Sequence, residues 1–162
     1  MSYPWITEGN KFIGLKEIPG PRHNLTILNW LKELKAWWSE DETPWCGVYV
    51  AHCIKACNYQ IPKYYMRAKA WSEDWGVELP TATDGCIVVF DRKGGGHVGF
   101  VLGVTKDNLL AVLGGNQGNS VSVAKFDRSR VVGYYWPREF ALPNTYKTSQ
   151  IDIDGSVSTN EA

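Results

Sequence analysis

The spacing of apolar residues predicts a helix early in the chain. Between residues 27 and 34, isoleucine and leucine recur at helical spacing, with lysine and glutamate on the opposite side. Asn24 precedes this run and is a residue type that caps helix N-termini. We expect the first forty residues to be largely helical, with a break at residues 18–21, where the sequence reads Ile-Pro-Gly-Pro.

A second helical pattern runs from residue 46 to residue 57. Its apolar and thiol side chains form one stripe, at positions 46, 49, 50, 53, 54 and 57. Val48 and Ala51 make the other side partly apolar, so we expect this helix to be central and buried. We expect this helix to open at residues 43–46, where Thr43 can cap it and Pro44 suits the first helical position because its missing N–H needs no partner there.

From Cys86 the apolar period becomes that of strands. A short helix is expected near residues 64–71, followed by five runs rich in β-branched and aromatic residues, at 86–91, 97–104, 109–113, 121–126 and 131–136. Turn sequences separate these runs, which predicts an antiparallel meander. A meander that follows a helical half defines an α+β fold.

The last twenty residues differ from the rest of the chain. After Pro143 the sequence is polar and carries no periodic stripe. We therefore predict one domain over residues 1–142 and a loose polar tail at 143–162.

Charge and hydropathy restrict the kinds of partner that the protein can bind. Seventeen basic residues balance seventeen acidic ones, which argues against nucleic acid or an anionic membrane held by bulk charge. No apolar run approaches the roughly 18–20 residues of a transmembrane helix, and the first twelve residues do not have the pattern of a secretory signal. We expect a monomer made in the cytoplasm.

The four cysteines, at 46, 53, 57 and 86, are expected to be free thiols in a reducing compartment. The sequence holds no paired Cys-x-x-Cys hook, so we expect no zinc and no other cofactor.

Cys46 lies at the start of the second predicted helix. Unpaired backbone N–H groups and the helix dipole there lower a thiol's pKa and favour the nucleophilic thiolate. The alternative is a buried structural cysteine, which is how we interpret the other three.

A nucleophilic thiol needs a base, and His97 is the histidine best placed for that role. His23 lies in a Pro-rich loop, and His52 points away from Cys46 on the same predicted helix. His97 starts a strand after three glycines, where another group can approach closely. The alternative is a hydrogen-bonded packing residue.

The strand register suggests a third member. If residues 105–108 form a four-residue hairpin loop, His97 faces Asn116 across the two strands. A carboxamide there can orient the imidazole, as in a Cys-His-Asn triad. A bulge at Gly114–Gly115 would break this register.

These residues lie in segments that resemble a known superfamily. Residues 41–56, 85–103, 112–126 and 131–137 resemble the CHAP and NlpC-like cysteine amidohydrolases and peptidases, which cleave bacterial cell walls. The resemblance extends over roughly residues 4–137 and is carried by Pro-Trp-Cys, His-Val-Gly-Phe and Gly-Gly-Asn-Gln motifs, as in small single-domain phage endolysins. The family's usual Gly-Asp is replaced by Gly85-Cys86, with Asp84 displaced.

The resemblance implies a papain-like fold with Cys46 as nucleophile, His97 as general base and Asn116 as the residue orienting the imidazole. Candidate substrate-binding residues are Trp45, Gln117, Trp71 and Trp75, for which packing (or, for Gln117, a turn) is the alternative. Asp41 and Glu42 are interpreted as caps or as ligands for a substrate amine.

The function that follows is an endolysin-like peptidoglycan hydrolase that cuts an amide bond of the stem peptide. It would reach the cell wall from the host bacterial cytoplasm through a separate pore. The alternatives are an exported antibacterial effector amidase of the same fold and a catalytically inactive wall-binding module.

Overall fold

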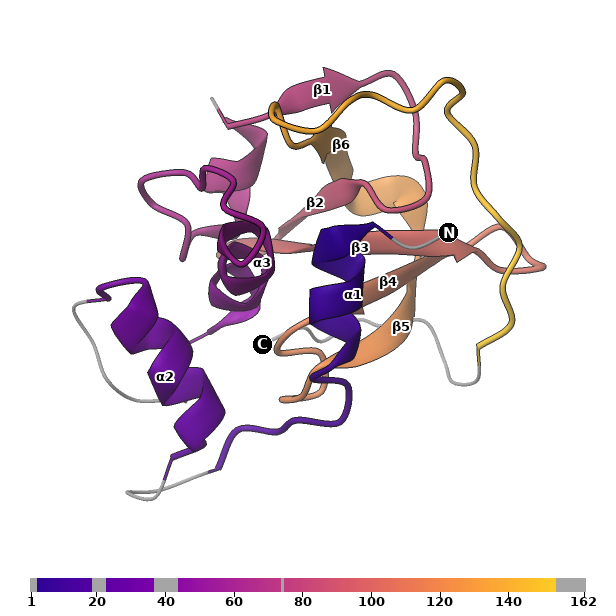
Figure 1. Cartoon of the computed structure of the whole chain (residues 1–162). Helices are drawn as coiled ribbons and strands as arrows, with labels where there is room; N and C mark the ends of the chain where they lie inside the picture. Colours follow the sequence, from indigo (N-terminus) through magenta and orange to yellow (C-terminus); the bar gives the residue numbers. More distant parts are fainter. Residues whose placement is uncertain (1–2, 19–22, 37–43, 74, 154–162) are drawn as a thin grey trace.

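The computed structural model describes residues 3–18, 23–36, 44–73 and 75–153. Within them, helices are followed by a six-stranded antiparallel sheet, so the predicted α+β class is confirmed (Figure 1). The helices are α1 Pro4–Asn10, α2 Leu25–Glu33, α3 Cys46–Lys55, a 3₁₀ helix at Ala68–Ser72 and a short 3₁₀ turn at Arg128–Arg130, between β5 and β6. The strands are β1 Val77–Leu79, β2 Ile87–Arg92, β3 Gly95–Val104, β4 Leu110–Gly114, β5 Ser122–Phe126 and β6 Val131–Trp136.

The strand order in the sheet is β1-β6-β2-β3-β4-β5. Strands β2 to β5 form the expected meander. The last strand departs from it, because β6 pairs with β2 instead of β5, and β1 covers the outer edge of β6. The alternation of side chains locates a strand along the chain but does not specify its neighbour in the sheet.

The predicted cap of α2 is confirmed. The Asn24 side chain accepts hydrogen bonds from the backbone N–H groups of Thr26 at 2.8 Å and Ile27 at 3.3 Å. Helix α3 begins at Cys46 with Trp45 in the N-cap position, so the prediction that Pro44 is the first helical residue is wrong by two positions. The predicted cap Thr43, together with Asp41 and Glu42, lies outside the described residues.

Helix α3 is central and buried, as its pattern predicts. It packs on β3 and β4, and α1 and α2 contact it in turn (Figure 1). The Tyr49 hydroxyl donates to the Gly9 carbonyl at 2.9 Å and ties α3 to α1. A Cβ at Gly9 would lie 2.5 Å from that hydroxyl, so the glycine permits the close contact.

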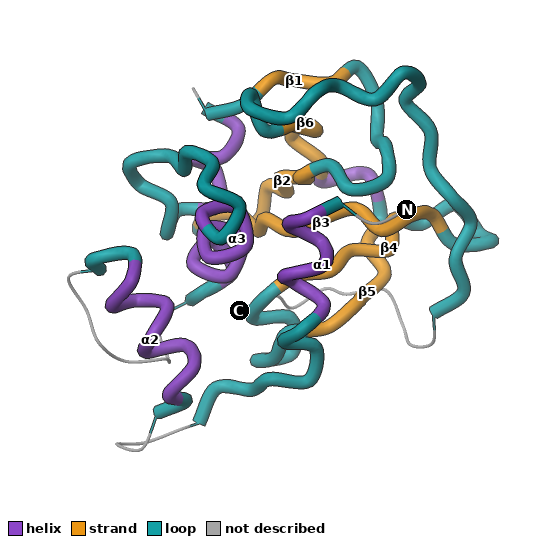
Figure 2. Tube along the Cα trace, in the orientation of Figure 1, coloured by secondary structure: helices purple, strands orange, loops and turns teal. Residues whose placement is uncertain are grey.

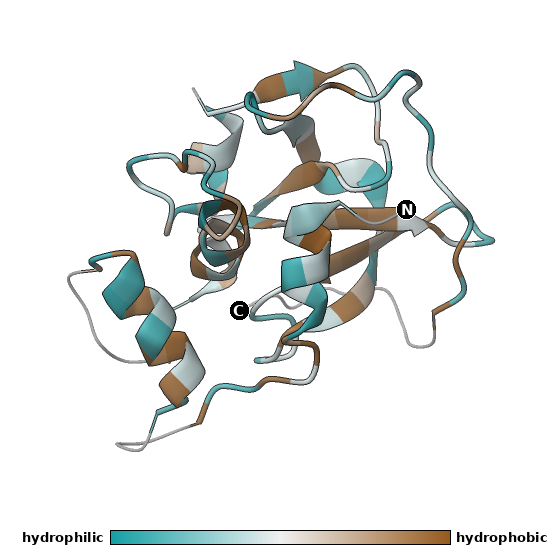
Figure 3. Ribbon diagram, viewed as in Figure 1, coloured by the Kyte–Doolittle hydropathy of each residue, from teal (hydrophilic) through white to brown (hydrophobic). Residues whose placement is uncertain are grey.

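The strands at the centre of the sheet form the apolar core (Figure 3). Residues 87–90 of β2 are completely buried, which explains a continuous apolar run where a half-exposed strand would alternate. Most tryptophans also serve the core, since Trp5, Trp30, Trp45, Trp71 and Trp136 are almost completely buried.

Residues 137–153 follow β6 as an irregular segment that runs along the outside of the domain (Figure 2). The loose character expected of 143–162 is wrong for residues 147–151. Val104 N–H donates to the Ser149 carbonyl at 2.8 Å, and the Asp84 carboxylate accepts from Ser149 N–H at 2.9 Å. Backbone pairing and one carboxylate hold this stretch, and neither leaves an apolar stripe in the sequence. The domain boundary after residue 142 remains a prediction.

Candidate active site

Cys46 is the first residue of α3, and its side chain is directed at β3. The sulfur accepts hydrogen bonds from the backbone N–H groups of Val98 and Gly47. Val98 directly follows His97, so the fold brings the predicted nucleophile to the strand that carries the predicted base. Only 5% of Cys46 is exposed.

Burial dominates the electrostatics of this thiol. Loss of solvent raises the pKa of Cys46, and this effect exceeds the lowering produced by the Val98 N–H and by the charge of Arg92. The sequence predicted a lowered pKa from the helix N-terminus alone, and the net direction is the opposite. The thiol therefore needs a base in contact with it to become a nucleophile.

His97 is buried, and one of its nitrogens faces a carboxamide. His97 Nε2 lies 2.9 Å from Gln117 Oε1. The amide nitrogen of Gln117 donates to the carbonyls of Ser122 at 2.8 Å and Val112 at 3.2 Å, which fixes the orientation of the carboxamide. Its oxygen accepts, so His97 Nε2 carries the proton and Nδ1 is the basic nitrogen.

Aromatic packing sets the plane of the imidazole. The His97 ring stacks on Phe126 at a centroid distance of 5.4 Å and on Phe90 at 6.1 Å. Gly114 borders the same hydrogen bond, because a Cβ there would lie 2.3 Å from Gln117 Oε1. The ring thus has little freedom to turn.

The register of β3 and β4 agrees with the prediction in part. The hairpin loop is one residue longer than predicted, and β3 has a bulge at Leu102. The bulge cancels the extra loop residue, so Phe100 still pairs with Leu113 as expected. The ladder ends before Asn116, which is buried in the loop after β4 with a φ of 58°. The orienting role of Asn116 remains a prediction.

The residue that forms the described hydrogen bond to His97 is Gln117, which the sequence analysis assigned to substrate binding. The left-handed backbone at Asn116 turns the chain, so that strand alternation no longer indicates which side chain faces the imidazole. The Gly-Gly before it was the sequence signal for such an irregularity.

His52 lies on the side of α3 that meets α1 and α2. Its Nε2 lies 2.7 Å from Glu8 Oε2, its Nδ1 lies 3.4 Å from Glu33 Oε2, and its ring stacks on Trp30. This position agrees with the orientation expected from helical periodicity, away from Cys46.

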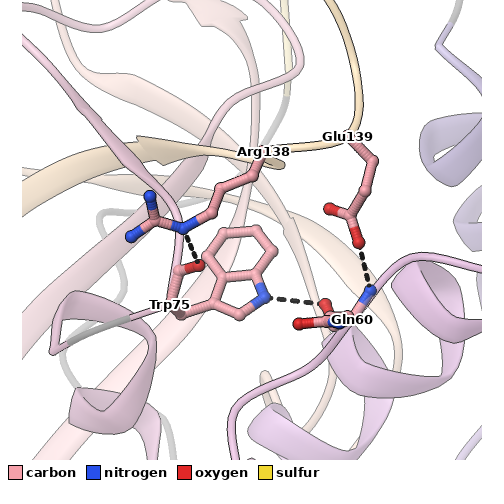
Figure 4. A pocket seen from close by; sticks show the side chains of 4 residues that line it. All are labelled: Gln60, Trp75, Arg138 and Glu139. Atoms are coloured by element: carbon pink, nitrogen blue, oxygen red, sulfur yellow. Dashed lines mark hydrogen bonds between the residues drawn. The ribbon is translucent and has the colours of Figure 1, made fainter.

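The three tryptophans predicted to bind substrate lie in three different surroundings. Trp45 donates to Glu17, and the fully buried Trp71 donates to the Tyr65 carbonyl. Trp75 lines a separate pocket of about 540 Å³ with Gln60, Arg138 and Glu139, in which its indole N–H donates to the Gln60 carbonyl at 2.8 Å (Figure 4). The contacts of Trp45 and Trp71 are those of packing residues, and a substrate-binding role for any of the three remains a prediction.

A pocket of about 280 Å³ opens on Cys46. The start of α3, the segment leading into the 3₁₀ helix and the β2–β3 hairpin enclose it. Its lining residues are Pro44, Cys46, Met66, Arg67, Ala68, Lys69, Arg92, Gly94, Gly95 and Gly96. This pocket offers a substrate carbonyl a route to the sulfur.

Two further observations concern the described part of the chain. It holds no group of three or more His, Cys, Asp or Glu side chains suited to a metal ion. None of its helices is long and apolar enough to cross a membrane.

The structure thus joins a thiol at the first residue of α3 to the strand that carries His97, and a carboxamide forms a hydrogen bond with that histidine. Residues 38–116, just under half of the chain, match the family model of the CHAP domain. The resemblance to the CHAP superfamily is thus confirmed over these residues. CHAP domains are typically cysteine-dependent amidases or peptidases, and the match indicates hydrolysis of this type on peptidoglycan. No curated protein matches the sequence significantly.

Proposed function

We propose that the protein is an endolysin-like peptidoglycan hydrolase that cleaves an amide bond of the stem peptide with Cys46 as nucleophile and His97 as general base. The observation that carries this proposal is the bond between His97 Nε2 and Gln117 Oε1. It leaves Nδ1 basic on a strand whose next residue, Val98, contacts the Cys46 sulfur.

The reaction has two stages. The Cys46 thiol passes its proton to His97 Nδ1, and the sulfur attacks the amide carbonyl carbon. The imidazolium then protonates the leaving amine, the C–N bond breaks, and an acyl-enzyme thioester remains. In the second stage His97 takes a proton from water, the resulting hydroxide displaces sulfur from the acyl carbon, and the free thiol is restored with release of a carboxylic acid.

The start of α3 also supplies charge stabilisation. Backbone N–H groups there, including those of Cys46 and Gly47, already face the sulfur. Donors in this position stabilise both a thiolate and the oxyanion that forms as the carbonyl is attacked. They also offset part of the cost of burying the thiol.

The biological setting belongs to the same proposal. A phage protein of this kind is made in the host bacterial cytoplasm and reaches peptidoglycan through a separate pore. It acts as a monomer on the wall, without a cofactor.

Clearing of purified peptidoglycan tests the proposal. Wild-type protein should reduce the turbidity of sacculi, and Cys46→Ala should abolish clearing while binding to sacculi persists. Cys57→Ala is the matched control, since Cys57 is a partly buried cysteine near the other end of the same helical segment, and it should clear normally. Mass spectrometry of the released fragments identifies the bond.

Two results would overturn the assignment. One is continued clearing by Cys46→Ala. The other is wild-type protein that binds sacculi without releasing fragments, which would identify an inactive wall-binding module.

A further inference from the structure

The pocket at Cys46 is positively charged, although the chain as a whole carries no net charge. Three of its lining residues are cationic, namely Arg67, Lys69 and Arg92, and none is acidic. They come from two separate segments that face the same space. A charge of one sign gathered in a cleft attracts a substrate group of the opposite sign.

Two of these cations have acidic partners outside the lining. Lys69 Nζ lies 2.5 Å from Asp91 Oδ1, and Arg67 lies 3.5 Å from the Glu73 carboxylate, in a pair that is largely exposed. Arg92, the third cation of the lining, belongs to neither of these ion pairs.

Arg92 is partly buried at the end of β2. Its Nε is shielded from solvent and has no hydrogen-bond acceptor within reach among the described residues. The adjacent Asp91 carboxylate is engaged by Lys69. A buried N–H without an acceptor is unfavourable, and an incoming acceptor relieves that cost.

Arg92 also acts on the nucleophile. Its charge lowers the pKa of Cys46 against the larger effect of burial, so the guanidinium and the sulfur are electrostatically coupled across the pocket. A planar guanidinium binds a carboxylate through two parallel N–H···O bonds. A carboxylate held in this way would lie beside the carbonyl under attack.

The wall next to Arg92 is bare backbone. A Cβ built at Gly95 would meet nothing within 4 Å, so the absence of a side chain there leaves open space in the pocket. A substrate backbone can therefore approach the β2–β3 hairpin closely.

We infer that the pocket beside Cys46 binds a substrate carboxylate through Arg92, so that the enzyme prefers an amide bond next to a free carboxylate over the same bond next to a carboxamide. The inference rests on the proposed function and narrows its substrate class to stem peptides with an ionised carboxyl group adjoining the cleaved bond. Arg92 is then a specificity-determining residue.

A matched pair of synthetic stem peptides tests the preference. Both contain the bond identified by mass spectrometry, and they differ only in a carboxylate or a carboxamide beside it. We expect wild-type kcat/KM to be about 10-fold or more higher for the carboxylate peptide. Arg92→Gln should lower kcat/KM for that peptide by about 10-fold or more and reduce the preference to near one.

Two variants accompany this comparison. Arg92→Lys keeps the positive charge but cannot form the two parallel N–H···O bonds of a guanidinium, so it should retain an intermediate preference for the carboxylate peptide. Lys93→Gln removes the exposed cation next in the chain, which does not line the pocket, and should leave the preference unchanged. Equal wild-type rates on both peptides, an equal loss on both in Arg92→Gln, or a cleaved bond with no adjoining carboxylate would overturn the inference.

A second measurement does not require turnover. Iodoacetate and iodoacetamide alkylate the same thiolate at the same carbon, and the first carries a carboxylate. The rate of alkylation of Cys46 by iodoacetate, divided by its rate with iodoacetamide at the same pH, is independent of the thiolate fraction. We expect this ratio to exceed that of glutathione and to fall about 5-fold or more in Arg92→Gln, with Lys93→Gln unchanged.

The outcomes separate the two proposals. A rate ratio equal to that of glutathione, or unaffected by Arg92→Gln, overturns carboxylate binding even where the protein hydrolyses peptidoglycan. Clearing that survives Cys46→Ala overturns the proposed function, whatever the alkylation ratio is.

Discussion

The nitrogen of His97 that carries the proton is set by Gln117. Gln117 Oε1 lies 2.9 Å from His97 Nε2, while its amide nitrogen is bound to the carbonyls of Ser122 and Val112. The carboxamide cannot rotate without losing two hydrogen bonds. Gln117 therefore acts on the proposed chemistry as a positioning residue through the imidazole.

Removal of this carboxamide should cost activity without unfolding the protein. We expect Gln117→Ala to lower kcat by about 10²-fold, because the imidazole loses the acceptor that selects its tautomer. The pH profile of kcat should also shift, which a purely structural defect would not cause. Steady-state kinetics from pH 5 to 9 measures both effects.

Asn116→Ala is the matched comparison, since the sequence predicts Asn116 for the same role. Asn116 lies next to Gln117 in the loop and is equally buried. A larger loss of kcat in Asn116→Ala than in Gln117→Ala, with the pH profile shifted only in the former, would return the orienting role to Asn116.

The reactivity of Cys46 should depend on His97. Burial raises the pKa of the thiol, so at pH 7 an isolated Cys46 would hold less thiolate than an ordinary cysteine. We expect Cys46 to react with iodoacetamide at pH 7 faster than the other three cysteines in wild-type protein, and at least about 10-fold slower in His97→Ala. In the variant the rate should rise steadily as the pH approaches the raised pKa.

Peptide mass spectrometry after timed alkylation gives each rate separately. Cys53 and Cys86 are completely buried, and burial raises the pKa of Cys86 to about 12, so both serve as internal controls that should stay unmodified. Faster modification of Cys57 than of Cys46, or an unchanged rate in His97→Ala, would contradict the proposed pair.

His52 is expected to serve stability alone. His52→Ala removes the hydrogen bond to Glu8 and the stacking on Trp30, so we expect a loss of about 1–3 kcal/mol in the free energy of unfolding, with kcat within about 2-fold of wild type. Urea unfolding and the clearing assay measure the two quantities. Near-complete loss of activity in a folded His52→Ala protein would contradict the assignment of His97 as base.

The pH dependence of that loss follows from Glu8. Burial alone would raise the pKa of Glu8, but Lys11 and His52 together hold it below its ordinary value. The stabilisation is therefore complete above the ordinary glutamate pKa of about 4.3 and disappears as the pH falls through the lower, folded value. The difference in the free energy of unfolding between wild type and His52→Ala should therefore become smaller in that pH range.

The C-terminal segment should depend on Asp84. Asp84→Ala removes the acceptor for Ser149 N–H, so we expect residues 147–151 to detach more often, at a cost of about 1–3 kcal/mol. Hydrogen exchange at Ile151 N–H, which donates to the Val104 carbonyl, should become faster. Asp152→Ala, a nearby exposed acid, is the control, and equal exchange in both variants would contradict the anchor.

The positions of most strands and of the central helix could be predicted from local patterns in the sequence. The five predicted strands and the helix containing Cys46 agree with the structure to within about two residues, because alternation and helical periodicity record which faces are buried. The neighbour of β6, the three-residue strand β1 and the pairing of Ser149 depend on contacts between distant parts of the chain. They leave no periodic signal.

The same distinction holds at the site. A cysteine at a helix start and a histidine at a strand start can be located from the sequence. The choice between Asn116 and Gln117 depends on one left-handed residue in the loop after β4. The direction of the pKa shift of Cys46 depends on burial by the whole fold, which a motif does not reveal.

The position of β6 has a consequence for biosynthesis. This strand is made last yet fills a place next to β2, well inside the sheet. On the ribosome, one edge of β2 stays uncovered until Trp136 has emerged, and the hairpin that carries Arg92 and His97 lacks its support. The sheet that carries His97 is therefore completed only after the last of its strands has been made.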